Sequence, residues 1–336
     1  MPASTVPLDP ALDAQPKRRS GWRMFLIVIG VLAGITVLYV GVASWVASSL
    51  VGNITEEVQK AIAKDTSAPP TDPLEPGYRG DPGQAFGYAF EDVMIQTPLG
   101  DAPAWFVPGQ SSTWAIYVHG IGGHREGGYD HLSVLQPAGV PTLLISYRND
   151  EDAPADPSGM YGFGLTEWHD LEAAVDYALA HGATGVILDG ESMGGAIIGQ
   201  FMKNSDRADR VVALVLDCPA LDMHIIAEGA MERARLPLPN AVASLGLWIA
   251  DQRFDIPLGE ARSIDVIAAW EGPLFLAHGD TDSIVPIATS DDLVTARFAP
   301  TVFLRTHAQH IGSWAENPER YREWLGAFLT AVLPTS

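Results

Sequence analysis

Residues 186–199 constrain the fold more than any other stretch of the chain. A β-branched run over 186–188 leads into Gly-Glu-Ser-Met-Gly at 190–194, and a second apolar run begins after Gly195. A G-x-S-x-G pattern between a strand and a helix is typical of a nucleophile elbow, where a strained turn exposes the serine hydroxyl. The pattern therefore predicts an α/β sheet with a reactive Ser192 at the carboxyl end of one strand.

Strands alternate with helices on both sides of this segment. A hairpin is expected over 90–96 and 102–107, and the apolar strands expected after it are 114–119, 142–146, 186–189, 211–216, 273–277 and 301–305. Helical stretches separate them, at 128–138, 165–181, after Ser192, from Pro286 and over 318–333. Apolar strands separated by helices predict a mostly parallel sheet covered on both faces.

Residues 219–270 interrupt this alternation with an apolar run, a Leu-Pro-Leu-Pro sequence and a helix near 240–250. We interpret them as a cap inserted over the mouth of the sheet. The core of the domain is then formed by 85–218 and 271–336.

The N-terminal region contains no charged side chain from Met24 to Thr55. About 20 apolar residues cross a bilayer, so 24–47 is interpreted as a transmembrane signal anchor. A cleaved signal peptide is the alternative, although its apolar region is normally only about 7–15 residues long. Four basic residues lie within 1–23 and no further one follows before Lys60. The positive-inside rule therefore predicts a single-pass protein of the cell membrane, with 1–23 as a cytoplasmic tail and the catalytic domain on the outer side.

Residues 48–84 are interpreted as a stalk and a Pro-rich linker. Ile54, Val58 and Ile62 recur at helical spacing, and five prolines fall within 66–84. Such a segment is expected to be semi-rigid and to hold the next domain away from the membrane surface.

The formal net charge is −21, and Cys218 is the only cysteine. So acidic a chain is a poor match for nucleic acid, because it repels phosphates. A single cysteine excludes disulfides within the chain, and Cys218 is interpreted as a small buried residue.

A serine hydroxyl is a weak nucleophile that needs an imidazole base oriented by a carboxylate. Asp282 lies in a loop that follows an expected strand, and His310 lies after the final strand. The order Ser192, Asp282, His310 is that of α/β-hydrolases. Asp280 as the acid and His307 as the base remain open as alternatives.

The glycine-rich run at 119–123 follows the first parallel strand and lets the backbone approach the serine. The N–H groups of Ile121 and Met193 are the expected oxyanion donors; a tight turn without a catalytic part is the other interpretation. Further candidate pocket residues are His119, Gly120, Gly122, Arg125, Tyr147, Arg148 and Glu191, with ion pairing between loops as the alternative for the arginines. No metal-ligand motif or phosphate-binding loop is present, and the expected chemistry needs no metal or cofactor.

Residues 85–332 resemble an α/β-hydrolase, and in particular the membrane-anchored Bem46-like serine hydrolases related to the ABHD proteins. The resemblance is carried by Val118-His119-Gly120, Ser146-Tyr147-Arg148, 190–195, 278–286, and His310 followed by Trp314 and Tyr321. It implies Ser192 as nucleophile, His310 as base and Asp282 as acid, with Ile121 and Met193 as oxyanion donors. Glu191 departs from the histidine that many lipases of this fold carry there.

Together these observations predict a membrane-anchored serine hydrolase that cleaves an acyl ester or thioester of a small-molecule substrate, lipid-like or an acylated component of the cell envelope. A serine peptidase of the same fold and a non-catalytic, membrane-tethered interaction protein are the alternatives. The sequence leaves the oligomeric state open.

Overall fold

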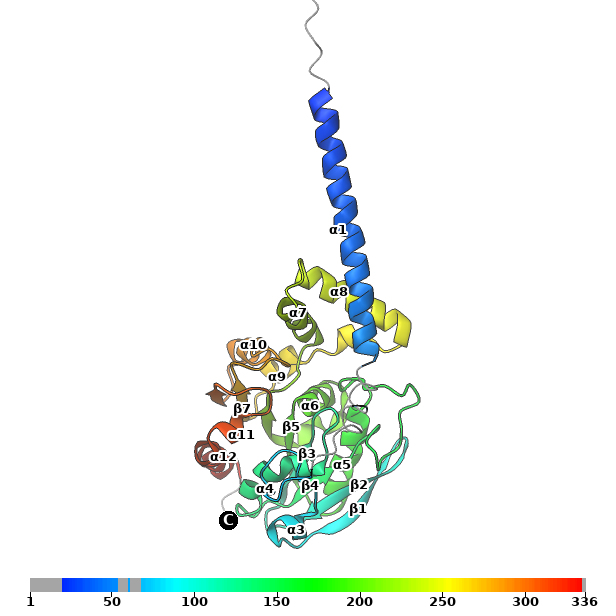
Figure 1. Cartoon of the computed structure of the whole chain (residues 1–336). Helices are drawn as coiled ribbons and strands as arrows, with labels where there is room; N and C mark the ends of the chain where they lie inside the picture. Colours follow the sequence, from blue (N-terminus) through cyan, green and yellow to red (C-terminus); the bar gives the residue numbers. More distant parts are fainter. Residues whose placement is uncertain (1–19, 54–59, 61–67, 334–336) are drawn as a thin grey trace, which may run out of the picture.

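An eight-stranded sheet forms the centre of the protein (Figure 1). The computed structural model describes residues 20–53, 60 and 68–333, and its strands are ordered β1-β2-β4-β3-β5-β6-β7-β8. The first two strands form a hairpin whose second strand pairs antiparallel with β4, and all other pairs are parallel. The strands are β1 (Glu91–Thr97), β2 (Gly100–Val107), β3 (Thr113–Val118), β4 (Thr142–Ile145), β5 (Gly185–Glu191), β6 (Val211–Asp217), β7 (Leu274–Gly279) and β8 (Thr301–Thr306). The predicted mostly parallel sheet with an opening hairpin is confirmed.

Helices cover both faces of the sheet, which is why its central strands are apolar along their whole length. In β5, Val186 and Leu188 pack into the core on one face and Ile187 into the core on the other. The first face carries α5 (Trp168–Ala180), α6 (Met193–Asn204), α9 (Ile264–Ala269) and α10 (Ala288–Ala296), and the second carries α4 (Tyr129–Leu135) and α12 (Pro318–Val332). Short helices complete the domain: α3 (Pro82–Phe86), η1 (Arg125–Gly128), η2 (Asp206–Arg210) and α11 (Ser313–Glu316).

The region expected to be a cap leaves the sheet after β6 and returns at β7. It contains α7 (Met223–Arg233), α8 (Pro239–Phe254), η3 (Leu258–Glu260) and α9. Asp222 caps α7 by accepting hydrogen bonds from the N–H groups of His224 and Ile225, and Pro239 opens α8, where a missing N–H has no cost.

Helix α1 (Ser20–Gly52) stands out from the body (Figure 1). Among the described residues it is the one helix long and apolar enough, over Trp22–Leu50, to cross a membrane. Its last turns contact α8 directly. The expectation that 48–84 holds the next domain away from the membrane surface stays a prediction. The helical stalk expected at Ile54, Val58 and Ile62 lies outside the described residues.

Candidate active site

Ser192 lies in the one-residue turn between β5 and α6. Its φ of 52° and ψ of −118° lie in a region that L-residues avoid, so the turn holds strain. The turn needs glycine beside it: a Cβ on Gly194 would collide with the carbonyl oxygen of Val118, and one on Gly195 with Pro219. The local sequence is thus what allows the strand to reverse into the helix.

Two hydrogen bonds connect Ser192 to a histidine and a carboxylate that follow other strands. His310 Nδ1 lies 2.7 Å from Asp282 Oδ2, and His310 Nε2 lies 2.9 Å from Ser192 Oγ. With Nδ1 donating to the carboxylate, Nε2 is the acceptor for the serine hydroxyl. The structure therefore brings together the three side chains that the sequence suggested.

Asp282 is fixed in its ionised form. Its Oδ1 accepts hydrogen bonds from the N–H groups of Ile284 at 2.7 Å and Val285 at 2.9 Å. Burial alone would raise the pKa of this carboxyl, but hydrogen bonds to His278 and His310 outweigh burial and hold its pKa well below the usual range. His278 is buried, with Nε2 3.3 Å from Asp282 Oδ2.

The alternative acid and base pair with each other instead. His307 Nδ1 lies 2.6 Å from Asp280 Oδ1, and the His307 side chain is 81% exposed. This pair lies on the surface, and the hydrogen bonds to Ser192 and Asp282 come from His310.

The glycine-rich loop after β3 lies against the serine, since a Cβ on Gly120 would come within 3.0 Å of Ser192 Cβ. His119 fixes this loop: its Nε2 bonds Asp150 at 2.9 Å and its Nδ1 bonds the Gly120 carbonyl at 2.8 Å. Burial lowers the pKa of His119, but the charge and hydrogen bond of Asp150 outweigh burial and raise it overall. Tyr147 stacks on the His119 ring and donates its hydroxyl to the carbonyls of His119 and Gly120.

Met193 is the first residue of α6, so its N–H has no acceptor within the helix. The assignment of Met193 and Ile121 as oxyanion donors stays a prediction, and the rigid loop and the helix N-terminus are the features on which it depends.

Comparisons with known proteins agree with this architecture. The esterase Pf2001 of Pyrococcus furiosus aligns with a TM-score of 0.59 at 18% identity, over 80% of this chain and 100% of that one. A thermophilic esterase of Thermogutta terrifontis aligns with a TM-score of 0.53 at 18% identity, over 73% and 100%. The chain has the α/β-hydrolase fold.

The relatives found by sequence similarity have descriptions that state no activity. Two proteins of Mycobacterium tuberculosis, from two strains and each described as uncharacterized, are 27% identical over 224 residues, or 63% of this chain and 69% of theirs. No family model matches the chain.

Behind the elbow of this α/β-hydrolase fold lies a buried polar network that the sequence did not reveal. Tyr117 donates its hydroxyl to Glu191 Oε1 at 2.5 Å. Burial, followed by the charge of Asp130, raises the pKa of Glu191 to about 8. The residue before the nucleophile is therefore a neutral carboxylic acid at pH 7.

His131 continues the network on the other side of Glu191. It lies 2.7 Å from both Asp189 and the Tyr321 hydroxyl, and that hydroxyl donates to Asp217 at 3.0 Å. Burial works against its protonation, but Asp189 and Asp130 outweigh burial and raise the pKa of His131 to about 10. The charged imidazole thus compensates the buried carboxylates beneath the strand ends.

A cavity of about 410 Å³ opens beside His310 and Glu191. Its other walls are the glycine-rich loop around Gly122, the turn around Glu126, and residues 73–79 of the segment predicted to be a linker. The sequence had no signal for 73–79, because a proline-rich extended segment shows no periodic face. This segment is part of the domain.

Of the candidate pocket residues, Gly122 and Glu191 line this cavity. His119, Gly120 and Tyr147 lie behind it and support the loop. Arg125 stacks on Trp105 and pairs with Asp152 at 2.7 Å.

Arg148 is buried and binds Asp170 through two nitrogens and Asp156 through a third. Arg125 and Arg148 therefore both form ion pairs, which was the alternative to a role in lining the pocket.

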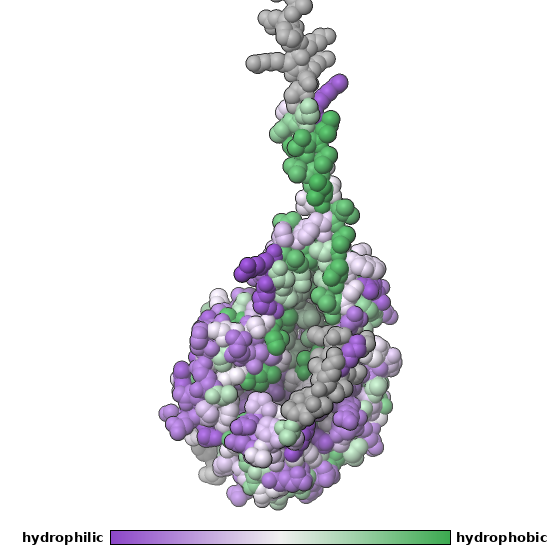
Figure 2. Space-filling model, in the orientation of Figure 1, coloured by the Kyte–Doolittle hydropathy of each residue, from purple (hydrophilic) through white to green (hydrophobic). Residues whose placement is uncertain are grey.

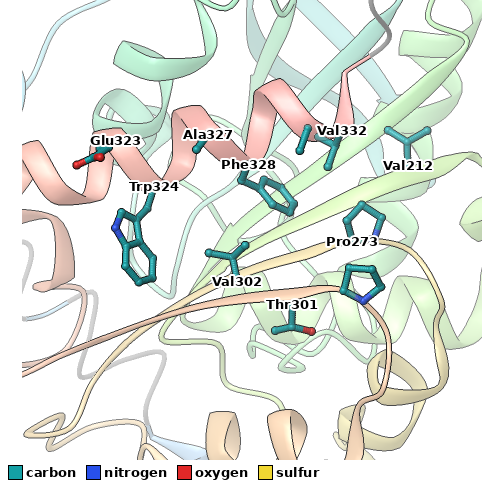
Figure 3. A pocket seen from close by; sticks show the side chains of 11 residues that line it. Val212, Pro273, Thr301, Val302, Glu323, Trp324, Ala327, Phe328 and Val332 are labelled. Atoms are coloured by element: carbon teal, nitrogen blue, oxygen red, sulfur yellow. The ribbon is translucent and has the colours of Figure 1, made fainter.

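A larger cavity of about 780 Å³ lies at the opposite edge of the sheet, between α12 and the start of β6, β7 and β8 (Figure 3). Val212, Trp324 and Phe328 make it apolar, and Glu323 is its one ionisable group. The candidate catalytic groups follow the other ends of the strands, so this cavity is not part of their site.

Cys218, Asp282 and His310 place possible metal-ligand atoms within 4.8 Å of one another. The thiol is instead engaged in hydrogen bonds, donating to Asp217 at 2.9 Å and accepting from the Ile311 N–H at 3.3 Å. Burial raises the pKa of the thiol well above its ordinary value, which disfavours the thiolate that a metal requires. Cys218 is buried, as expected.

Proposed function

We propose that this chain is a membrane-anchored serine hydrolase that cleaves acyl esters through Ser192, His310 and Asp282. The observation that carries the proposal is the chain of hydrogen bonds from Asp282 through His310 to Ser192, on a strained turn at the edge of an α/β-hydrolase sheet. Strain at such a turn is retained where a side chain must be presented in one position. The names of the structural neighbours, several of which are esterases, support the reaction class.

The geometry supports the following steps. Ser192 Oγ attacks the acyl carbonyl carbon while His310 Nε2 takes its proton, and the N–H groups of Ile121 and Met193 stabilise the oxyanion. The carbon–oxygen bond to the alcohol breaks as His310 returns the proton to the leaving oxygen. Water then attacks the acyl-serine, again giving a proton to His310, and release of the acid restores Ser192. Asp282 stays ionised throughout and holds His310 in the required tautomer.

The membrane anchor rests on α1, whose uncharged residues 24–38 are exposed on every side. A helix that is apolar all round is not stable against water and is typical of a membrane span. The basic residues that precede it support an N-terminus in the cytoplasm and a catalytic domain on the outer side. An anchored enzyme with an apolar cap is suited to lipid-like or acylated envelope substrates.

Hydrolysis of p-nitrophenyl acetate and p-nitrophenyl octanoate by the full-length chain tests the proposal. Ser192→Ala should abolish both activities, whereas Ser112→Ala, at an exposed serine far from the site, should leave them unchanged. Retained activity in folded Ser192→Ala would refute the assignment. Cleavage of amide reporters at rates comparable with esters would instead favour a serine peptidase.

A further inference from the structure

The second half of α1 is packed along the cap. Tyr39 donates its hydroxyl to the Pro237 carbonyl at 2.9 Å, and Ser44 donates to the Val242 carbonyl at 3.1 Å. Further down, Arg253 of α8 donates to the hydroxyls of Ser48 at 2.7 Å and Ser49 at 2.8 Å.

Apolar contacts follow the same path. Ala47 is buried with Val242 and Ala243 of α8, and Gly246 lets the two helices approach closely. The Arg253 guanidinium also lies 4.3 Å from the centre of the Trp45 ring. The cap is therefore attached to the anchor helix over several turns.

The length of α1 determines how far the cap can be from a bilayer. The part of α1 that no other element covers is 22–38, which spans about 25 Å at about 1.5 Å per residue. The hydrocarbon core is about 30 Å thick. If α1 crosses the membrane, the core takes about 20 residues. Counted from Met24, the first residue after Arg23, it ends near residue 43, so Tyr39 lies close to the outer surface. The turn at 236–238, bonded to Tyr39, must then lie there too.

The composition of the cap is suited to a position at the membrane surface. Residues 236–250 contain no ionisable side chain, although the chain as a whole carries a net charge of −21. Leu238 is 51% exposed and Trp248 is 59% exposed. Arg233 and Arg235, exposed at the end of α7, lie next in the sequence, where anionic headgroups would attract them.

The face of α1 next to its contact with α8 is also apolar, and its side chains are exposed. Val42, Trp45, Val46 and Leu50 recur at helical spacing, and each is more than half exposed beside the α8 contact. Figure 2 shows the hydrophobic surface of α1 continuing down to where the helix meets the body. Apolar surface of this extent is costly in water and is favourable at a lipid interface.

We propose that the cap docks on the bilayer: Val42, Trp45 and Val46 of α1, together with Leu238 and Trp248 of the cap, lie among the headgroups and upper acyl chains. We call these residues the cap platform. The partner is the lipid surface itself. This inference rests on the proposed membrane anchoring and does not depend on the proposed hydrolysis.

Packing contacts link the cap platform to the candidate nucleophile. Ile226 of α7 packs with Ala196, Ala220 and Val285. Ala220 in turn donates its N–H to the carbonyl of Ser192.

Site-directed fluorescence on the full-length chain in vesicles of phosphatidylcholine and phosphatidylglycerol tests the docking. Single cysteines at Leu238 and Trp248 are labelled with an environment-sensitive dye; Met94→Cys, on β1 at the far end of the body from α1 (Figure 1), is the matched control with 52% exposure. Val31→Cys reports on the anchor itself. Cys218 is fully buried, and the unsubstituted chain shows whether it takes label.

The dyes at positions 238 and 248 should lose most of their emission when the vesicles contain phospholipid with a doxyl group on the acyl chain, and iodide in the water should barely affect them. The dye at position 94 should be quenched by iodide in the water and should barely respond to the doxyl phospholipid. Lipid quenching at position 31 with iodide quenching at 238 and 248 would overturn the docking while leaving the anchor intact. No lipid quenching at position 31 would refute the anchoring and the docking together. Ester hydrolysis by the same samples reports separately on the proposed chemistry.

Discussion

Replacing Glu191 with Gln tests the neutral carboxyl that lies beside the nucleophile. Burial and the charge of Asp130 raise its pKa from 4.5 to about 8. Between these values the native state keeps a proton that the unfolded chain releases, so the free energy of unfolding falls as the pH rises and levels off above pH 8. One pKa unit corresponds to about 1.36 kcal/mol, which makes the total loss on the order of 3 to 5 kcal/mol. Gln is neutral throughout and its amide oxygen still accepts the Tyr117 hydroxyl.

Urea unfolding of the full-length chain in detergent micelles, between pH 4.5 and pH 8, measures this effect. The free energy of unfolding of Glu191→Gln, taken relative to that of the parent, should rise by about 3 to 5 kcal/mol between pH 4.5 and pH 8. The free energy of unfolding of Glu323→Gln, which changes an exposed carboxyl, should vary with pH as that of the parent does. Above pH 8 the parent gains a charge next to Ser192, so its kcat/KM for a neutral ester should fall while that of Glu191→Gln persists. Parallel stability curves for the two proteins would refute the reasoning.

Four further substitutions have defined outcomes. Asp282→Asn should lower kcat/KM for ester hydrolysis by about 10³ to 10⁴, because His310 loses its orienting carboxylate. It should also lower the melting temperature, because the depressed pKa of Asp282 stabilises the native state at neutral pH; an unchanged rate in the folded variant would remove Asp282 from the mechanism. Gly194→Ala should prevent folding through its clash at the elbow. Gly326→Ala on α12, where an added Cβ meets Val134 at an ordinary contact distance of 3.9 Å, should raise stability by about 0.5–1 kcal/mol in thermal unfolding. Arg253→Ala should weaken the attachment of the cap by about 1–3 kcal/mol, seen as faster hydrogen exchange in α8; unchanged exchange would show that the attachment does not need this side chain.

Local patterns were sufficient to predict the order of the strands and the sharp turn at Ser192. Each depends on residues close together in sequence: β-branched runs, glycine at a forced turn, and apolar spacing. The choice of His310 over His307 was harder, since the two are only three residues apart and both follow β8. In the structure their side chains point in different directions: His307 bonds Asp280 at the surface, and His310 bonds Ser192.

Other features depend on contacts that no local pattern encodes. Tyr117 and Glu191 meet across neighbouring strands, 74 residues apart in sequence. The contact between α1 and α8 joins two mostly apolar segments that are far apart in sequence, so periodicity could not show that they pack on one another. The catalytic roles of Ser192, Asp282 and His310 remain predictions that only chemistry can test.

The most direct test of the central claim is labelling of the full-length chain in vesicles with a fluorophosphonate, with the modified residue mapped by mass spectrometry. The account predicts a covalent adduct on Ser192 that is lost in His310→Ala and retained in His307→Ala. A folded chain that takes no label, or a His310→Ala variant labelled as fast as the parent, would contradict it.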